Sequence, residues 1–356
     1  MARKHGRPAR VGRGRPMRKP VPKQAGRLFS HFSLFGDAPR MKVFLGVDGG
    51  GTSTRAILVN STGNVLGRGE SGPSNYHNVG IPSAIANIVE AAGCARLTSG
   101  LSDVSVQAAF LGCAGVKASV DIARMTSAAE TAGLAPAGEI TVANDLHNAL
   151  AGGLSGKPGI ALISGTGTNC LGQDASGKSF MCGGWGWLLD DEGGGFGLAL
   201  AAMKAAARAA DGRSGKTSLL PSVLAFLGLS EPNELLARLY VDKWTPDELA
   251  GFAPVVIRCA NDGDASANRI LKEGAAALGK LVAGAARALD FPDRPDVVLL
   301  GGCVRSGFPY QPLAEEAILK ACPGARIADP EHSPVHGAAL NALRSGGIHP
   351  LPKLLC

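Results

Sequence analysis

A short stretch of one acid, three glycines and a threonine carries the residues best suited to phosphate chemistry. It is Asp48-Gly-Gly-Gly-Thr52, which follows the apolar run Val43–Val47 and precedes a second apolar run. Successive glycines let the backbone turn tightly and bring its N–H groups close to an anion. Asp48 can hold a hydrated Mg²⁺, and the Thr52 hydroxyl can bind a phosphate oxygen. The pattern predicts a phosphate-binding turn between two strands, whereas the turn alone is equally compatible with an ordinary β-hairpin.

The same pattern returns later in the chain. Within Ile160–Gly172, the stretch Ser164-Gly-Thr-Gly-Thr168 separates two apolar runs, and a turn at 174–178 leads to a third short apolar run at 179–182. A strand, glycine turn, strand and strand therefore occur twice. This recurrence predicts a duplicated domain rather than a solenoid, whose repeats are shorter.

Helical and strand-like patterns alternate around these two copies. Helices are expected at 83–95, 119–132, 146–154, 197–210, 219–227, 246–261, 268–289 and 336–344, and further strands at 106–112, 139–142 and 297–300. Alternating elements of this kind predict an α/β fold with mixed sheets covered by helices. We expect two duplicated halves, 41–150 and 151–356, that face each other across a cleft.

The net charge of +7 arises from the first 40 residues. They contain eleven Lys and Arg residues against the single acid Asp37, so the rest of the chain is mildly acidic. Because the segment is rich in Arg, Pro and Gly and lacks apolar periodicity, we predict that residues 1–40 form a disordered basic tail. Three interpretations stay open: a mis-called start with Met41 as initiator, an anchor for nucleic acid or anionic surfaces, and an organelle-targeting peptide.

Other features of the composition limit the class of protein. No apolar run has the roughly 18 residues of a membrane span, so no membrane association is expected. The eight cysteines are scattered without metal-ligand spacing, which favours a reduced, cytoplasmic location. A nucleic-acid partner is suggested by the tail alone.

Longer motifs resemble a known superfamily. The two glycine turns, the Asn144-Asp145 pair and the late Leu300-Gly-Gly302 turn resemble the actin/Hsp70/sugar-kinase superfamily, whose two domains are ribonuclease H-like (actin-like ATPase) folds. Gly165-Thr-Gly-Thr-Asn-Cys170 and Gly183-Gly-Trp-Gly-Trp-Leu-Leu-Asp-Asp-Glu-Gly193 resemble most specifically the N-acetylglucosamine kinases, in the group shared with the BadF/BadG/BcrA/BcrD ATPases. The resemblance covers residues 41–345.

The resemblance implies ATP-dependent phosphorylation of the C6 hydroxyl of N-acetylglucosamine, with ATP and Mg²⁺ as cofactors and a homodimer as the assembly. It makes Asp48 the anchor of Mg²⁺, with water between the carboxylate and the ion. The implied ATP- and phosphate-binding residues are Gly49, Gly50, Gly51, Thr52, Gly165, Thr166, Gly167, Gly301 and Gly302. The implied sugar-binding residues are Asn75, Asp145, Asn169, Cys170, Gly184, Trp185 and Asp191.

Several of these residues also have simpler interpretations. Asp145 is the candidate general base, but Asn144-Asp145 before Leu146 is also a good capping context for the next helix. Cys170 is more often a buried small apolar residue than a ligand contact. Trp187 is expected to pack in the core, and Trp185 to form a flat apolar wall for a sugar. Asp191 and Glu192 would also be favourable at a helix N-terminus.

Two departures from the family pattern concern the second half. Thr168 stands where serine is usual, and Gly193-Gly-Gly195 is more flexible than the usual sequence.

Two further functions stay in competition. One is a glucosamine kinase of the same group, and the other is a BadF/BadG-type ATPase that activates a partner enzyme, although the Cys-rich context expected for such an activator is missing from the sequence.

Overall fold

The computed structural model describes residues 41–355 except 102–104, 243, 292–293 and 306–307. Residues Met41–Cys356 form one structural unit. The predictions for residues 1–40 lie outside the described residues and stay predictions.

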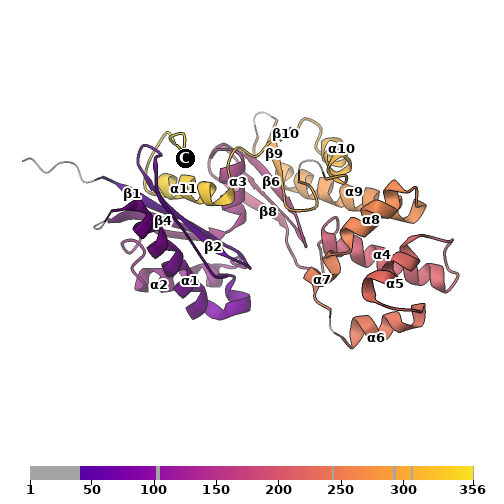
Figure 1. The fold of residues 1–356 in the computed structure, drawn as a ribbon. Helices are drawn as coiled ribbons and strands as arrows, with labels where there is room; N and C mark the ends of the chain where they lie inside the picture. The colour runs from indigo at the N-terminus through magenta and orange to yellow at the C-terminus, as the bar shows by residue number, and fades with distance from the viewer. Residues whose placement is uncertain (1–40, 102–104, 243, 292–293, 306–307, 356) are drawn as a thin grey trace, which may run out of the picture. The chain divides into compact units, whose positions relative to one another are not determined.

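The first sheet has five strands in the order β3-β2-β1-β4-β5 (Figure 1). Their bounds are β1 Val43–Gly49, β2 Thr54–Asn60, β3 Val65–Ser71, β4 Val106–Cys113 and β5 Ile140–Asn144. β1, β2 and β3 are antiparallel neighbours, whereas β4 runs parallel to β1 and β5 parallel to β4. Because Gly49 pairs with Thr54, the predicted glycine turn closes the first hairpin.

The second sheet repeats this topology. Its strands are β6 Gly159–Ser164, β7 Thr168–Gln173, β8 Ser179–Gly183, β9 Asp296–Leu300 and β10 Arg326–Ala328, in the order β10-β9-β6-β7-β8. β6, β7 and β8 are antiparallel neighbours, and β9 and β10 follow in parallel. Ser164 pairs with Thr168, so the second glycine turn closes the equivalent hairpin. The predicted α/β fold with two duplicated halves is confirmed.

Helices cover both faces of each sheet because side chains of a strand alternate between the faces. On the first sheet, Val43, Leu45 and Val47 pack with α1 (Tyr76–Ser99) and α2 (Ser119–Thr131). Phe44 packs on the opposite face with α11 (Pro334–Ser345). On the second sheet, the largest cluster contains α4 Gly195–Ala210, α5 Leu219–Leu227, α8 Ala253–Asn261, α9 Ala265–Ala288 and α10 Gln311–Ala321.

Two helices pack on the sheet of the other half. Helix α3 (Leu146–Gly153) follows β5 of the first sheet, yet Leu146 and Leu150 pack with Val298 of the second sheet. Helix α11 comes after the second sheet in sequence and covers the first one, and it contacts α3 (Figure 1). The backbones approach closely, since a Cβ added to Gly337 of α11 would overlap the carbonyl of Asn148. The chain division at 150/151 stays a prediction, because each half contributes a helix to the core of the other.

Several element boundaries differ from the sequence prediction for local reasons. Helix α1 begins at Tyr76 rather than 83, because the Asn75 side chain caps it and the helix continues through a kink at Gly80. The single helix expected at 246–261 is two helices, α7 Pro246–Ala250 and α8, separated at Gly251. The sequence prediction missed α6 (Leu235–Tyr240), α10, β10 and the 3-10 turn Pro232–Glu234.

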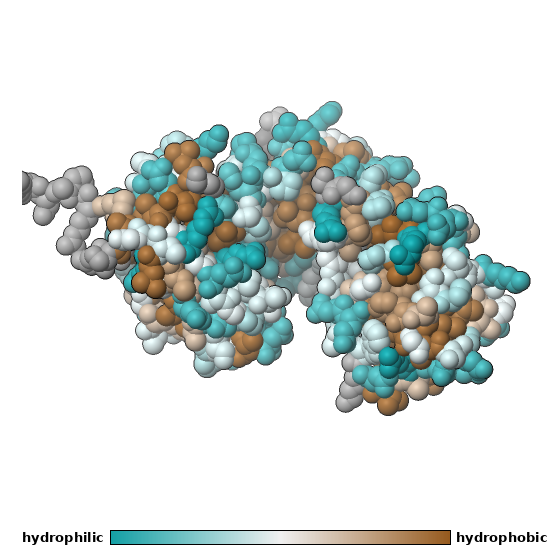
Figure 2. Space-filling view, viewed as in Figure 1, coloured by the Kyte–Doolittle hydropathy of each residue, from teal (hydrophilic) through white to brown (hydrophobic). Residues whose placement is uncertain are grey.

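The surface of the second half carries exposed apolar side chains. Leu236, Tyr240 and Val241 at α6 are largely exposed, and Figure 2 shows hydrophobic side chains gathered over the region of α4 to α6. None of the described helices combines the length and apolar character needed to cross a bilayer.

Candidate active site

The first glycine turn presents unpaired backbone donors. Gly50 N–H donates to Ser53 O, and Gly50 O accepts from the N–H groups of Ser74 and Asn75. Within the described part of the chain, the N–H groups of Gly51 and Thr52 donate to no protein group, and both residues are exposed. Backbone donors are nearly always paired in folded proteins, so two adjacent unpaired donors are available for an anion or water.

Asp48 lies at the end of β1, beside this turn. Its Oδ1 accepts a hydrogen bond from Asn148 Nδ2 at 3.0 Å. Burial raises the pKa of the Asp48 carboxyl, although the Asn148 hydrogen bond and the charge of Arg55 oppose the shift. A partly buried carboxylate next to free backbone donors is suited to a cation that also contacts phosphates bound by those donors.

Asn148 was not predicted from the sequence. Its side chain is fully buried, and Nδ2 also donates to Val47 O at 3.0 Å. A Cβ added to Gly112 would overlap this amide, so the glycine leaves room for it. Asn148 therefore ties α3 to the ends of β1 and β4 and orients Asp48. No sequence signal distinguished it from a surface asparagine, because its partners lie far away in sequence.

Asp145 lies between β5 and α3, and its side chain makes no capping hydrogen bond. The neighbouring Asn144 Oδ1 instead accepts from Leu146 N–H at 3.1 Å. Asp145 thus occupies the N-cap position of α3, as the capping interpretation expects, but Asn144 supplies the side-chain hydrogen bond. Burial, with a further contribution from the negative charge of Asp48, raises the pKa of Asp145 to about 6. A carboxyl group with this pKa accepts a proton readily near neutral pH.

Asn75 reaches the same region through α1. Its Oδ1 accepts from His77 N–H at 3.2 Å, and its backbone N–H donates to Gly50 O in the first turn. The structure thus brings Asn75, the first turn, Asp48 and Asp145 to one edge of the first sheet. Asn75 also has a structural role as a helix cap, which the sequence prediction did not include.

The second glycine turn is held by backbone hydrogen bonds to the start of α4. Gly165 N–H donates to Gly167 O, while Gly165 O and Thr166 O accept from Gly195 and Phe196 at the start of α4. The Thr166 and Gly167 N–H groups have no protein acceptor within the described residues, and Thr166 is exposed. The second turn therefore also presents two adjacent free donors, in the position equivalent to the first turn.

Asp191 supports this second turn. Its Oδ1 accepts from Thr168 N–H at 2.7 Å, and its backbone has φ 75°, a conformation that is rare for a residue with a side chain. Burial is the largest cause of the raised pKa of this carboxyl. The structure assigns Asp191 to positioning the turn, whereas its predicted contact with the sugar stays a prediction.

The late glycine turn also joins the second hairpin. Gly301 has φ 97°, and an added Cβ would overlap the carbonyl of Ser164. Cys303 N–H donates to Ser164 O at 2.9 Å, and its thiol contacts Gly165 O. The predicted residue Gly301 therefore lies beside Gly165, and the role of Gly301 and Gly302 at a nucleotide stays a prediction.

The remaining predicted sugar residues divide into two groups. Asn169 lies next to Gly184, because a Cβ on Gly184 would meet the Asn169 amide at 2.5 Å, and Trp185 follows with 68% of its surface exposed. Cys170 instead points into the core, fully buried. The structure gives Cys170 a packing role. Trp187, expected in the core, is half exposed and has an edge contact with Phe196.

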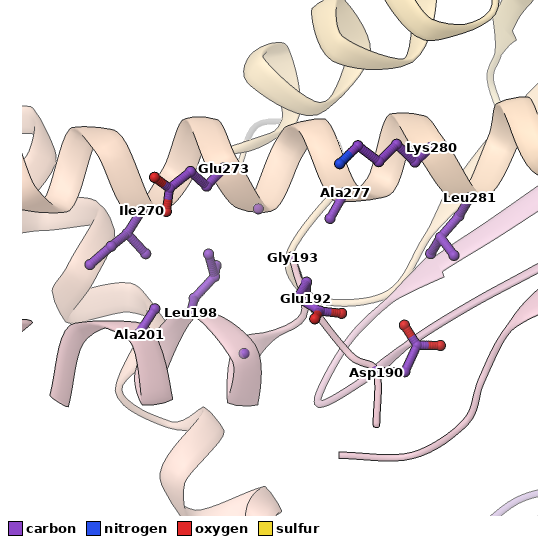
Figure 3. A pocket seen from close by; sticks show the side chains of 12 residues that line it. Asp190, Glu192, Gly193, Leu198, Ala201, Ile270, Glu273, Ala277, Lys280 and Leu281 are labelled. Atoms are coloured by element: carbon purple, nitrogen blue, oxygen red, sulfur yellow. The ribbon is translucent and has the colours of Figure 1, made fainter. Parts of the chain in front are cut away.

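A cavity of about 460 Å³ adjoins the loop around Asp191 (Figure 3). It lies between α4 and α9, and its polar rim consists of Asp190, Glu192, Glu273 and Lys280. Asp190 links it to the turn predicted to bind sugar, since Asp190 Oδ2 accepts from the backbone N–H of Trp185 at 3.3 Å. The predicted phosphate donors Thr166 and Gly167 do not line this cavity.

The residues around Asp48 fit Mg²⁺ as a nucleotide-bound ion. No group of three or more His, Cys, Asp or Glu side chains converges on a metal position in the described part of the chain. Mg²⁺ commonly keeps several waters and uses one or two carboxylates together with substrate phosphates. A single partly buried carboxylate at Asp48 beside free N–H groups meets that requirement.

Comparison with known proteins agrees with this arrangement. The family model described as the BadF/BadG/BcrA/BcrD ATPase family matches residues 45–342. An N-acetylmuramic acid/N-acetylglucosamine kinase of Clostridium acetobutylicum is 33% identical over 76% of this chain and 88% of its own length. An N-acetyl-D-glucosamine kinase of Dictyostelium discoideum is 32% identical over 85% and 98%.

A solved structure shows the same architecture. A Chromobacterium violaceum protein, provisionally described as an N-acetylglucosamine kinase, superposes with a TM-score of 0.66 and 28% identity, covering 86% of this chain and all of the other. With these similarities and the duplicated hairpins, the chain belongs to the BadF/BadG/BcrA/BcrD ATPase family.

Proposed function

We propose that this protein transfers the γ-phosphoryl group of ATP to the C6 hydroxyl of N-acetylglucosamine, giving N-acetylglucosamine 6-phosphate. The observation that carries the proposal is the pair of equivalent turns, each with two free backbone donors, together with Asp145 beside Asp48. Phosphoryl transfer depends mainly on positioning and on compensation of phosphate charge, which such turns supply.

In this proposal each residue group has a defined task. Gly49–Thr52 holds one side of the triphosphate and Gly165–Gly167 the other, while Gly301 and Gly302 approach the adenosine. Mg²⁺ bound through water at Asp48 would neutralise phosphate charge. Asp145 accepts the proton of the C6 hydroxyl as that oxygen attacks the γ-phosphorus.

The sugar would be held by groups from both sheets. Asn75 and Asn169 can each donate and accept hydrogen bonds to hydroxyl groups. Trp185 offers a flat apolar face. The two relatives described above are both named as kinases of N-acetylglucosamine, which favours the N-acetyl sugar over glucosamine. We further propose a homodimer in the cytoplasm.

The test is ADP release by the full chain with ATP, Mg²⁺ and a panel of sugars. The panel contains N-acetylglucosamine, glucosamine, N-acetylmannosamine, N-acetylmuramic acid and glucose. We expect selective turnover of N-acetylglucosamine. A preference for glucosamine would keep the mechanism and change the substrate, whereas ATP hydrolysis independent of every sugar would favour an ATPase that activates a partner enzyme.

A further inference from the structure

We infer that Lys117 is a positioning residue for the sugar substrate, because its ammonium group holds the Gly183–Trp185 turn against the loop that follows β4. This inference rests on the proposed function, which places Gly184 and Trp185 at the sugar. Lys117 belongs to none of the predicted motifs. It comes from the loop between β4 and α2, whereas the turn that it contacts follows β8 of the second sheet.

Three contacts define the position of the Lys117 ammonium group. Nζ donates to Gly184 O at 2.9 Å and to Gly183 O at 3.2 Å. It also lies 4.4 Å from the centroid of the Trp185 ring, in the range of a cation–π interaction. Lysine has three donors and no acceptor, and these neutral partners match that chemistry. In the described part of the chain, no carboxylate forms an ion pair with Lys117.

The loop that carries Lys117 is attached to the groups proposed for catalysis. Ala114 N–H donates to Gly49 O at 2.7 Å, and Asn144 Nδ2 donates to Val116 O at 3.0 Å. Val116 is fully buried. Lys117 therefore starts from a backbone that is joined to the first phosphate turn and to the residue before Asp145.

The turn on the other side has little packing of its own. Gly183, Gly184 and Gly186 all have positive φ, so the backbone has the freedom of glycine. The Trp185 ring is mostly exposed, and the backbone N–H of Trp185 donates to Asp190 Oδ2 at 3.3 Å. Gly183 is fixed by its pairing with Asn169 in the sheet, whereas the exposed Trp185 beyond it is held by Asp190 and Lys117, so the contacts of Lys117 contribute to its placement. Lys117 thereby sets the distance between the Trp185 wall and the loop that is joined to Asp145.

The kinetic test compares Lys117→Met, Lys117→Arg and the control Lys178→Met in the full chain. Methionine keeps much of the apolar stem but removes the charge and all donors. We expect the KM for the sugar to rise roughly tenfold in Lys117→Met, with kcat and the KM for ATP changed less than about twofold. Arginine should restore most of the affinity. The control removes a lysine–carbonyl hydrogen bond of similar length, from Lys178 Nζ to Ala288 O, and should leave all constants unchanged.

A second readout needs no substrate. Trp187→Phe and Trp244→Phe leave Trp185 as the single tryptophan, whose fluorescence anisotropy and quenching by acrylamide report on the turn. We expect Lys117→Met to lower the anisotropy and increase quenching. Unchanged fluorescence together with an unchanged KM for the sugar would overturn the inference. If the unmodified protein phosphorylates no sugar, the proposed function fails, and the fluorescence still shows whether Lys117 holds the turn.

Discussion

The two halves of the molecule build the same hairpin with different chemistry at one equivalent position. The first glycine motif begins with Asp48, next to the last residue of β1, and the second begins with Ser164, the last residue of β6. Asp48 is partly exposed beside free N–H groups, whereas Ser164 is fully buried and donates its hydroxyl to Gly193 O at 2.9 Å. The two motifs thus share the turn, but only the first begins with a carboxyl group.

The halves also differ in how their turns are supported. Gly165 O, Thr166 O and Ser164 O of the second half all accept backbone hydrogen bonds from α4 or from the loop after β9. The first turn is joined through Gly49 O to Ala114 and through Gly50 O to the residues before α1. The two turns are therefore anchored to different neighbours: the second to α4 and the loop after β9, the first to the loop after β4 and the residues before α1.

The largest expected effect comes from removing the proposed base of the first half. Asp145→Asn should lower kcat by roughly 10²–10⁴-fold with a small change in the KM for the sugar. The variant should also be more stable above pH 6, by up to about 3 kcal/mol, because the raised pKa means that the folded state disfavours the charged carboxyl. That gain should vanish below the ordinary carboxyl pKa of 3.8. Coupled assays and denaturant unfolding at two pH values measure both effects, and a kcat within tenfold of the unmodified protein would refute the assignment.

The equivalent positions at the two strand ends provide the next test. Asp48→Asn should lower kcat/KM by about 100-fold and raise the Mg²⁺ concentration needed for half-maximal rate. Ser164→Ala should change the rate less than about threefold but reduce the free energy of unfolding by about 1 kcal/mol, since it removes a buried hydrogen bond. Equal losses of activity in the two variants would show that charge is not divided between the halves as we describe.

The pH dependence of the rate sharpens the role of the charge pair. Because Asp145 must be ionised to accept a proton, kcat/KM should fall about tenfold per pH unit below its pKa of about 6. Removing the charge of Asp48 removes one of the two causes of the raised pKa. The profile of residual activity in Asp48→Asn should therefore shift to lower pH. A pH profile that does not shift would show that the observed titration does not belong to Asp145.

The smallest expected effects compare the support of the two turns. A Cβ on Gly167 would meet Asp191 Oδ1 at 2.5 Å, so Gly167→Ala should lower the free energy of unfolding by roughly 1–3 kcal/mol. Gly51→Ala meets open space and should change it by less than about 0.5 kcal/mol. Thermal unfolding of both variants measures the two changes. Equal changes would show that the second turn tolerates an added side chain as readily as the first.

The sequence by itself determined the duplicated hairpins, the α/β class and the family, because these depend on local patterns. Alternating apolar residues, glycine turns and the motif around Trp185 are all contiguous in the chain. The placement of Asp48, Gly165 and Gly301 at strand ends follows from the same local signals, and β1, β6 and β9 confirm it.

Tertiary structure decided which of these residues act on one another. The exchange of α3 and α11 between the sheets, and the burial of Asn148 against Asp48, arise from packing between segments about 100 residues or more apart. Asn144 rather than Asp145 satisfies the helix donor, and Lys117 reaches Gly184 across the two sheets. Such contacts depend on how whole layers of helices and sheets bury their apolar faces against one another. A sequence pattern within one segment does not predict them.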